Sequence, residues 1–248
     1  MVTIIGSGEM AQALIAGLTQ EGMEVEVVAR DMEQLLRLEA LYPIKKSPLQ
    51  DFDIEGKVVI LAVKPQALED VARQVRGKAA IVLSVLAGTP IEKLHLIPSD
   101  AYVRAMPNIA AGKKASMTAL SGDEGAKEIA LNIFSKIGRT LWLQSEKELD
   151  IATAIAGSGP AFLALVAEAL MDGGVAAGLK RSDAIELTRG LFYSFSSLDD
   201  EHPALIKDRV MSPAGTTAAG YSALERGAVR SSFMEAVLQA YKRTLKAN

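Results

Sequence analysis

A strand, a glycine-rich turn and a helix open the chain, and this order strongly restricts how the chain can fold. Val2-Thr3-Ile4-Ile5 is an apolar strand, the turn follows directly, and an amphipathic helical pattern comes next. In the G-x-G-x-x-A spacing of the turn, Gly6 allows a tight bend, Gly8 lets the backbone approach a pyrophosphate, and Ala11 permits close packing of helix on strand. The pattern predicts a dinucleotide site at Gly6, Ser7, Gly8, Glu9 and Met10. The alternative is a tight strand-to-helix turn that binds nothing.

The second strand, residues 24–29, ends in two charged residues that bear on the choice of cofactor. After such a strand, an acidic side chain accepts from the ribose 2′-OH of NAD, whereas an arginine accommodates the 2′-phosphate of NADP. Arg30 comes first, and its planar donor fork suits a phosphate. Asp31 gives the opposite signal, although a negative charge there also favours the start of the helix expected at 32–41. We predict NADPH as the cofactor, with NADH as the second candidate. The alternative for Arg30 is a solvated surface charge.

Further apolar runs predict a parallel sheet that is covered on both faces, because such runs are typical of strands buried between two layers of helices. A helical pattern at about 125–137 separates the last two of them. The fold class that follows is α/β, with an N-terminal Rossmann-like, doubly wound domain over residues 1–145. The later strands are expected at residues 57–63, 79–85, 101–105, 116–120 and 139–143.

Open α/β sheets bind ligands at the carboxyl ends of their strands, and three residues stand at such ends. Lys64 follows one strand, and its alternative is a surface lysine without a chemical role. Ala87 follows the next strand and leaves room for a ribose or nicotinamide ring. Asn108 either bonds the cofactor carboxamide or ribose, or only caps its own turn.

From Glu146 onward the pattern is wholly helical. The helix expected at 161–171 is apolar all round, so its whole circumference should be buried. A domain of about a hundred residues rarely buries one helix so completely, and a partner subunit is the simplest remedy. We therefore predict a helical dimerisation and substrate-binding domain over residues 146–248. Its other helices are expected at 146–156, 182–198, 204–211, just after 212, and at 228–246.

Composition excludes several classes of function. The net charge is −3 without a basic run, which argues against nucleic acid as a partner. There is no cysteine, and the two histidines, His95 and His202, stand far apart, so we expect no disulfide and no metal site. No Lys or Arg precedes Arg30, unlike a secretory leader, and we expect a cytoplasmic protein. Residues 151–171 hold a single charge, but Gly157-Ser158-Gly159-Pro160 interrupts them, which favours two buried helical pieces over a membrane span.

A second helix start, near residue 212, carries the most distinctive residues of the chain. Ser212 suits the N-cap, Pro213 suits the first helical position, and Gly215 leaves the first turn bare of side chain. Exposed N–H groups and the positive end of the helix dipole form a seat for a small carboxylate or phosphate. Thr216 and Thr217 add two hydroxyls. The alternative is an ordinary capped helix with small packing residues.

This segment resembles the signature of pyrroline-5-carboxylate reductase, the last enzyme of proline synthesis: Ser-Pro-x-Gly-Thr-Thr-x-x-Gly, then x-x-x-Leu-Glu. Ala62-Val63-Lys64-Pro65, Met106-Pro107-Asn108 and Gly157-Ser158-Gly159-Pro160-Ala161 are also similar to motifs of that family and stand in its order. The resemblance thus covers essentially the whole chain. The chain departs from the family at Ala214, where Gly is usual, and at Ile109-Ala110, where Thr-Pro is usual.

The resemblance implies hydride transfer from NAD(P)H to the C=N carbon of 1-pyrroline-5-carboxylate, which gives L-proline. It implies that Ala62, Val63, Lys64 and Pro65 line the cofactor. The substrate carboxylate would sit on the N–H groups of Gly215, Thr216 and Thr217, helped by the Ser212 hydroxyl, with Thr217 Oγ facing the imine nitrogen. It also implies helical domains that interlock as homodimers, sometimes as rings of dimers, with the signature helix serving either its own or the partner's cofactor.

Two rival functions share this plan. A β-hydroxyacid dehydrogenase has a catalytic lysine about one helical turn after its glycine-rich helix start, but residues 161–166 contain no lysine. A non-catalytic NADP-binding sensor would share the fold without turnover. The intact Thr216-Thr217 pair argues against such a loss of activity.

Overall fold

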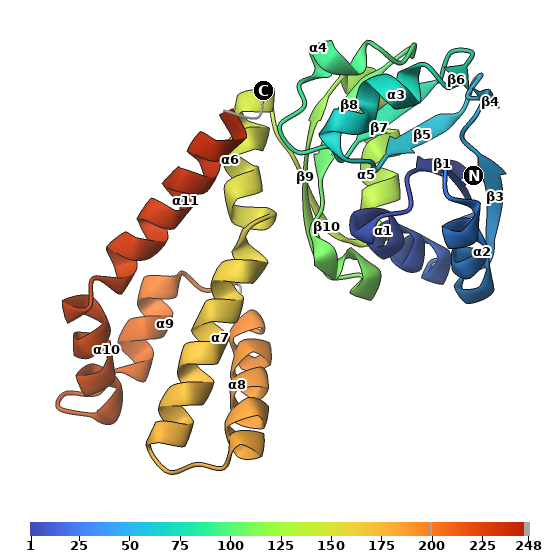
Figure 1. The fold of residues 1–248 in the computed structure, drawn as a ribbon. Coiled ribbons are helices and arrows are strands. Elements are labelled where there is room, and N and C mark those ends of the chain that lie inside the picture. The colour runs from blue at the N-terminus through green and yellow to red at the C-terminus, as the bar shows by residue number, and fades with distance from the viewer. Residues whose placement is uncertain (199, 246–248) are drawn as a thin grey trace. The chain divides into compact units, whose positions relative to one another are not determined.

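The computed structural model describes residues 1–198 and 200–245, and they divide into two compact units. The first contains Met1–Ser158 together with the end of the last helix from Ala240, and the second contains Gly159–Gln239. The first unit is built around a sheet and the second is made of helices (Figure 1). The α/β fold class, with a Rossmann-like part followed by a helical part, is therefore confirmed.

Among the described residues, the main sheet has eight strands. All neighbouring strands are parallel except β8 and β9, which are antiparallel. The chain order reverses direction at β1, which lies between β2 and β5, and this reversal is the point at which doubly wound folds bind nucleotides. In spatial order the strands are β10 (Gly138–Trp142), β9 (Ser116–Gly122), β8 (Tyr102–Met106), β7 (Ile81–Ser84), β5 (Val58–Leu61), β1 (Val2–Ile5), β2 (Val25–Ala29) and β3 (Ile44–Pro48).

Alternating side chains of the central strands fill two separate cores, one on each face of the sheet. Ile4 belongs to the core that contains residues of α1, α2 and α5, whereas Ile5 belongs to the core that contains residues of α3 and α4. Both faces are thus covered, as the continuous apolar runs predict. The elements that accompany the sheet are α1 (Glu9–Gln20), α2 (Met32–Leu41), β4 (Phe52–Asp53), η1 (Pro65–Ala67), α3 (Leu68–Ala72), β6 (Val75–Arg76), α4 (Ile91–Leu94), η2 (Ile109–Lys113), η3 (Glu124–Ala126), α5 (Lys127–Ser135) and α6 (Glu146–Ala156).

A buried ion cluster ties α6 to the sheet. Arg104, in the middle of β8, is 1% exposed. Its guanidinium donates to Glu146 Oε1 at 2.9 Å and to Asp150 Oδ1 at 2.8 Å, and both acids lie on α6. Glu146 Oε1 also accepts from the backbone N–H of Ile91. Because of this packing, the first compact unit includes α6 and ends at Ser158. The functional domain boundary that we expect at residue 145 stays a prediction.

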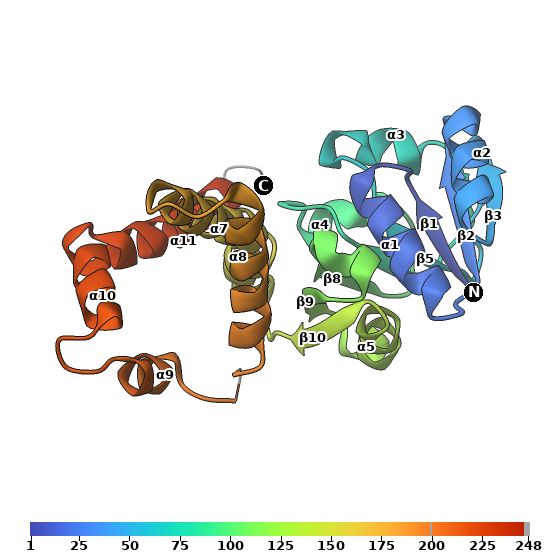
Figure 2. The same cartoon turned by 90° about the horizontal axis from the view of Figure 1, so that it is seen from below.

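The second unit contains α7 (Gly159–Ala176), α8 (Arg181–Ser196), α9 (Pro203–Val210) and α10 (Thr216–Arg226), and most of α11 (Val229–Leu245). Helix α8 contacts α7 and lies next to it in Figure 1, whereas Figure 2 views α7 nearly end-on. The expected end of the last helix at residue 246 lies outside the described residues. Some large apolar side chains of this unit are exposed in the single chain: Leu163, Leu165, Leu170, Leu187, Leu191, Tyr193, Phe195, Leu224, Met234 and Leu238.

The single chain does not bury the helix at 161–171, because α7 has no buried residue among those described. Its predicted burial, which needs a partner subunit, stays a prediction. Helix α7 is apolar on all sides, and one neighbouring helix cannot cover all of them, so apolar side chains stay exposed in the single chain. Residues Glu146–Ala176 are also long and apolar enough to cross a membrane by length and composition alone. The structure divides them into α6 and α7 at Gly157-Ser158, so the two helical pieces that the sequence predicts are present.

Candidate active site

The glycine turn between β1 and α1 has the backbone that its residue types predict. Gly6 has φ of +127°, and a Cβ added there would collide with the carbonyl of Ala62, which directly follows the neighbouring strand β5. Gly8 is the N-cap of α1, and a Cβ added to it would point into open space. Ala11 is fully buried against the core. The first-turn N–H groups of α1 therefore remain open to an anion, and the turn fits the pyrophosphate of a dinucleotide.

A cavity of about 740 Å³ opens in front of this turn, entirely within the first unit. The strands β1 and β2 and the segment that follows β5 contribute its walls, and α3 contributes one side. The structure brings nine of the predicted cofactor residues together here: Gly6, Ser7, Gly8, Glu9, Met10, Arg30, Ala62, Val63 and Lys64.

Arg30 and Asp31 lie at the β2 side of the cavity and have different partners. The Asp31 carboxylate accepts from the backbone N–H of Gln34 at 3.0 Å and is the N-cap of α2, so the helix-start interpretation of Asp31 is confirmed. The Arg30 side chain is 64% exposed, and its guanidinium lies 4.0 Å from a carboxylate oxygen of Asp70. Both residues line the cavity, but one oxygen of Asp31 is engaged by the backbone of α2, whereas the guanidinium of Arg30 lies near Asp70.

Asp31→Ala is expected to lower the free energy of unfolding by about 1 kcal/mol, because the N–H of Gln34 loses its acceptor. Asp31→Asn is the matched control, since asparagine caps a helix as well as aspartate does. Urea unfolding of both variants at one protein concentration checks this. Equal losses of stability in the two variants would show that charge, and not the cap, is what matters at this position.

The other predicted cofactor residues do not line this cavity. Pro65 begins η1 and is exposed, and Ala87 is also exposed. The carboxamide of Asn108 accepts from Ala110 N and donates to Ala156 O, both at 3.0 Å. It caps η2 and binds the end of α6, so the turn-cap alternative for Asn108 is confirmed. The cofactor roles of all three residues stay predictions.

The signature segment begins its helix later than the sequence predicts. Helix α10 starts at Thr216 with Gly215 as its N-cap, so the expected N-cap role of Ser212 and helical role of Pro213 are wrong. Ser212 and Gly215 instead close a turn, in which Gly215 N–H donates to Ser212 O at 3.0 Å. The physical reason is Ala214, whose φ of +57° is incompatible with a continuous right-handed helix.

This turn changes which N–H groups are available at the seat. Gly215 N–H is engaged with Ser212 O, and the first helical bond runs from Ala219 N to Gly215 O. The N–H groups of Thr216, Thr217 and Ala218 therefore have no acceptor within the helix. A side chain at position 215 would collide with Ser212 Oγ, which explains the glycine there. The seat is displaced by one residue from the expected set, with Ala218 in place of Gly215.

Ala214→Gly is expected to raise the free energy of unfolding by about 0.5–1 kcal/mol. A left-handed conformation costs an alanine about 1–2 kcal/mol, and the added flexibility of glycine in the unfolded chain offsets part of that gain. Ala219→Gly, inside α10, is the control and should lose about 1 kcal/mol. Thermal unfolding at fixed protein concentration measures both, and a destabilised Ala214→Gly variant would contradict the strain argument.

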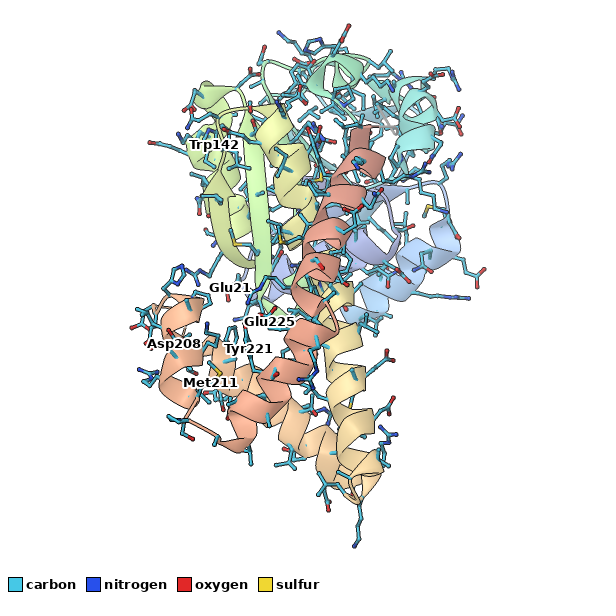
Figure 3. The ribbon with its side chains drawn as sticks, turned by 90° about the vertical axis from the view of Figure 1, so that its left-hand side faces the viewer. Glu21, Trp142, Asp208, Met211, Tyr221 and Glu225 are labelled. Atoms are coloured by element: carbon cyan, nitrogen blue, oxygen red, sulfur yellow. The ribbon has the colours of Figure 1, made fainter. Side chains whose placement is uncertain are left out.

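The rest of α10 is fixed by a polar cluster within the second unit. Tyr221 lies one turn after Thr217 on the same face, and its hydroxyl donates to Glu225 Oε1 at 2.6 Å (Figure 3). Arg230, on α11, contacts both Tyr221 and Glu225. The hydrogen bond from Arg230 lowers the pKa of Glu225, and the hydrogen bond to Glu225 raises the pKa of Tyr221. The cluster keeps the helix that carries the seat attached to α11.

Several residues that shape the cavity were not predicted from the sequence: Ile5, Val28, Ala29, Leu49, Ala67, Asp70 and Val71. The most informative are Ala67, Asp70 and Val71, which follow the Lys64-Pro65 turn at helical spacing. Their shared face after a strand end is a signal that could have identified them. Within the described part of the chain, no group of three or more His, Asp or Glu residues suits a metal ion.

Comparisons with known proteins agree with these features. Residues 146–247 match the family model for pyrroline-5-carboxylate reductase dimerisation, and residues 1–88 match the model for NADP oxidoreductases described as coenzyme F420-dependent. The chain is 40% identical to the pyrroline-5-carboxylate reductase of Synechocystis over 97% of its own length and 96% of the relative's.

Solved structures give the same picture. The 1-pyrroline-5-carboxylate reductase of Streptococcus pyogenes superposes with a TM-score of 0.85 at 30% identity, over 99% of this chain and 98% of that one. The pyrroline carboxylate reductase of Plasmodium falciparum, solved with NADP bound, shares the fold with a TM-score of 0.84 at 24% identity, over 99% of this chain and 98% of that one. The chain has the glycine turn and the helix-start seat, and it is similar to these reductases over nearly its full length. It therefore belongs to the pyrroline-5-carboxylate reductase family.

Proposed function

We propose that the protein reduces 1-pyrroline-5-carboxylate to L-proline with NADPH, with NADH as a weaker alternative. One observation carries the proposal: α10 presents the free N–H groups of Thr216, Thr217 and Ala218 beside two hydroxyls. The same chain has a glycine turn with a cavity in front of it, which we call the dinucleotide cradle. The seat suits a small carboxylate and the cradle suits a pyrophosphate. A reduction of a small anionic imine uses both.

The residues of the cradle bind the cofactor through backbone N–H groups and through the charge of a side chain. The N-terminus of α1 beyond Gly8 receives the pyrophosphate, and Arg30 receives the 2′-phosphate. Ala62, Val63 and Lys64 line the cavity after the end of β5. Pro65, Ala87 and Asn108 contact the part of the cofactor that extends beyond this cavity. When bound, the reduced nicotinamide supplies the hydride.

The signature segment orients the substrate. The N–H groups of Thr216, Thr217 and Ala218 bind the carboxylate, with the Ser212 hydroxyl and the Gly215 turn beside them. Thr217 Oγ lies against the imine nitrogen and orients it. A threonine hydroxyl is a poor acid, so the proton on that nitrogen comes with the substrate, which is itself a base, or from water.

A homodimer gives the apolar helices of the second unit their missing cover. The dimerisation model spans residues 146–247, the region that leaves the large apolar side chains of α7 and α8 exposed. We further propose that dimers can assemble into rings, that residues 146–248 act as the dimerisation and substrate-binding domain, and that the protein works in the cytoplasm without nucleic acid or membrane partners. Burial against the partner subunit also accounts for the apolar composition of Glu146–Ala176.

Loss of NADPH absorbance tests the function directly. The purified protein is assayed with 1-pyrroline-5-carboxylate and NADPH, and separately with a panel of β-hydroxyacids and NADP⁺. Turnover in the first assay only is the expected result. Turnover with a hydroxyacid would favour the dehydrogenase, and NADPH binding without turnover in either assay would favour the sensor.

A further inference from the structure

The cavity holds a carboxylate that opposes the residue assigned to the 2′-phosphate. Asp70, on α3, lines the same cavity as Arg30, and its Oδ2 lies 4.0 Å from an Arg30 guanidinium nitrogen. Both side chains are partly solvated, at 64% exposed for Arg30 and 48% for Asp70. The pairing is thus loose enough to be exchanged for a ligand, since exposed ion pairs are individually weak.

Asp31 also lines the cavity, but it differs from Asp70 in its partners. Its carboxylate is the N-cap of α2, with a hydrogen bond to Gln34 N. Of these two acids, Asp70 is the one that forms an ion pair with Arg30. It also forms an ion pair with Arg73, three residues later in the chain.

We propose that Asp70 is a specificity-determining residue that moderates the preference for NADPH over NADH. The inference rests on the proposed function and deepens it. A 2′-phosphate that pairs with Arg30 must displace the Asp70 carboxylate and then remain near a like charge, which costs free energy. A ribose 2′-hydroxyl meets no such repulsion, and a carboxylate can accept its hydrogen bond. Asp70 thereby penalises the phosphorylated cofactor selectively.

Asp70→Asn keeps the shape of the side chain and removes its charge. At a separation of several ångströms in a solvated cavity, one charge is expected to change the affinity for NADP⁺ about three- to tenfold. The variant should bind NADP⁺ more tightly by that factor, while NAD⁺ binding stays the same or weakens. The contrast should shrink as the salt concentration is raised, because these charges are exposed.

Calorimetric titration of the intact protein with NADP⁺ and with NAD⁺, without substrate, measures both affinities independently of turnover. Glu69→Gln is the matched control: Glu69 lies on the same helix and pairs with Arg73 at 4.0 Å, but it does not line the cavity. Arg30→Met should weaken NADP⁺ binding. In the Arg30→Met background, Asp70→Asn should still favour NADP⁺, by the repulsion alone.

An unchanged NADP⁺-to-NAD⁺ affinity ratio in Asp70→Asn, or an equal change in Glu69→Gln, would overturn the role of Asp70 while leaving the reductase activity standing. A wild-type protein that binds neither nucleotide would overturn the proposed function and this inference together. Thermal unfolding of each variant accompanies the titrations, so a folding defect is detected separately from a change in affinity.

Discussion

Arg104→Met is expected to lower the free energy of unfolding by about 3–5 kcal/mol, the usual cost of breaking a buried ion pair. Asp150, with a side chain that is 6% exposed, would keep its charge without the guanidinium that now neutralises it. Glu146 would lose the same partner but is 36% exposed and still accepts from Ile91 N. Most of the loss is therefore expected to come from Asp150.

Urea unfolding and thermal unfolding at one protein concentration measure this loss, and the melting temperature should fall by about 6–20 °C for a chain of this length. Arg104→Met combined with Asp150→Leu is the matched variant, because replacing both members of a buried pair by apolar groups is often neutral. The double variant should recover most of the stability. If it is no more stable than Arg104→Met, the uncompensated charge of Asp150 is not the cause.

The Arg104 cluster shows what the sequence could not reveal. Arg104 stands within an otherwise apolar strand, and its partners follow 42 and 46 positions later on a helix that reads as an ordinary polar-faced one. Nothing in local spacing joins them, because the pairing depends on α6 packing on the sheet. For the same reason the sequence places a boundary at residue 145, whereas the packing carries α6 into the first unit.

The glycine turn was predictable because its constraint is local. Gly6 needs a positive φ and a close approach to Ala62, and only glycine satisfies both. The strand, the turn and the following helix are each encoded within a few residues. The fold class followed from this turn and from the continuous apolar runs of the later strands.

The start of α10 was mispredicted although its signals are also local. Serine followed by proline favours a helix start, and this preference predicted an N-cap at Ser212. The chain forms a turn there instead, with Ala214 in a left-handed conformation. Propensity is a weak signal that such a turn overrides. The N–H groups of the seat consequently shift by one residue, from 215–217 to 216–218.

Thr217→Val is expected to lower kcat/KM for 1-pyrroline-5-carboxylate about tenfold to hundredfold or more, the equivalent of losing one transition-state hydrogen bond of about 1.5–3 kcal/mol. Thr217 is the second residue of α10 and its side chain is exposed. Valine matches its shape and leaves the N–H of the seat in place, so the carboxylate site survives. NADPH binding should be unchanged, because the dinucleotide cavity lies in the first unit.

Initial rates of NADPH oxidation over a range of substrate concentrations give kcat and KM, and a titration with NADP⁺ gives the cofactor affinity. Thr217→Ser is the matched control, since it keeps the hydroxyl and should retain most of the activity. Thr216→Val tests the neighbouring hydroxyl, which is not assigned to the imine nitrogen and should matter less. Steady-state kinetics that do not change in Thr217→Val would remove this hydroxyl from the mechanism. The N–H groups of the helix start and the Ser212 hydroxyl would then orient the substrate through its carboxylate, because the imine nitrogen would need no donor from Thr217.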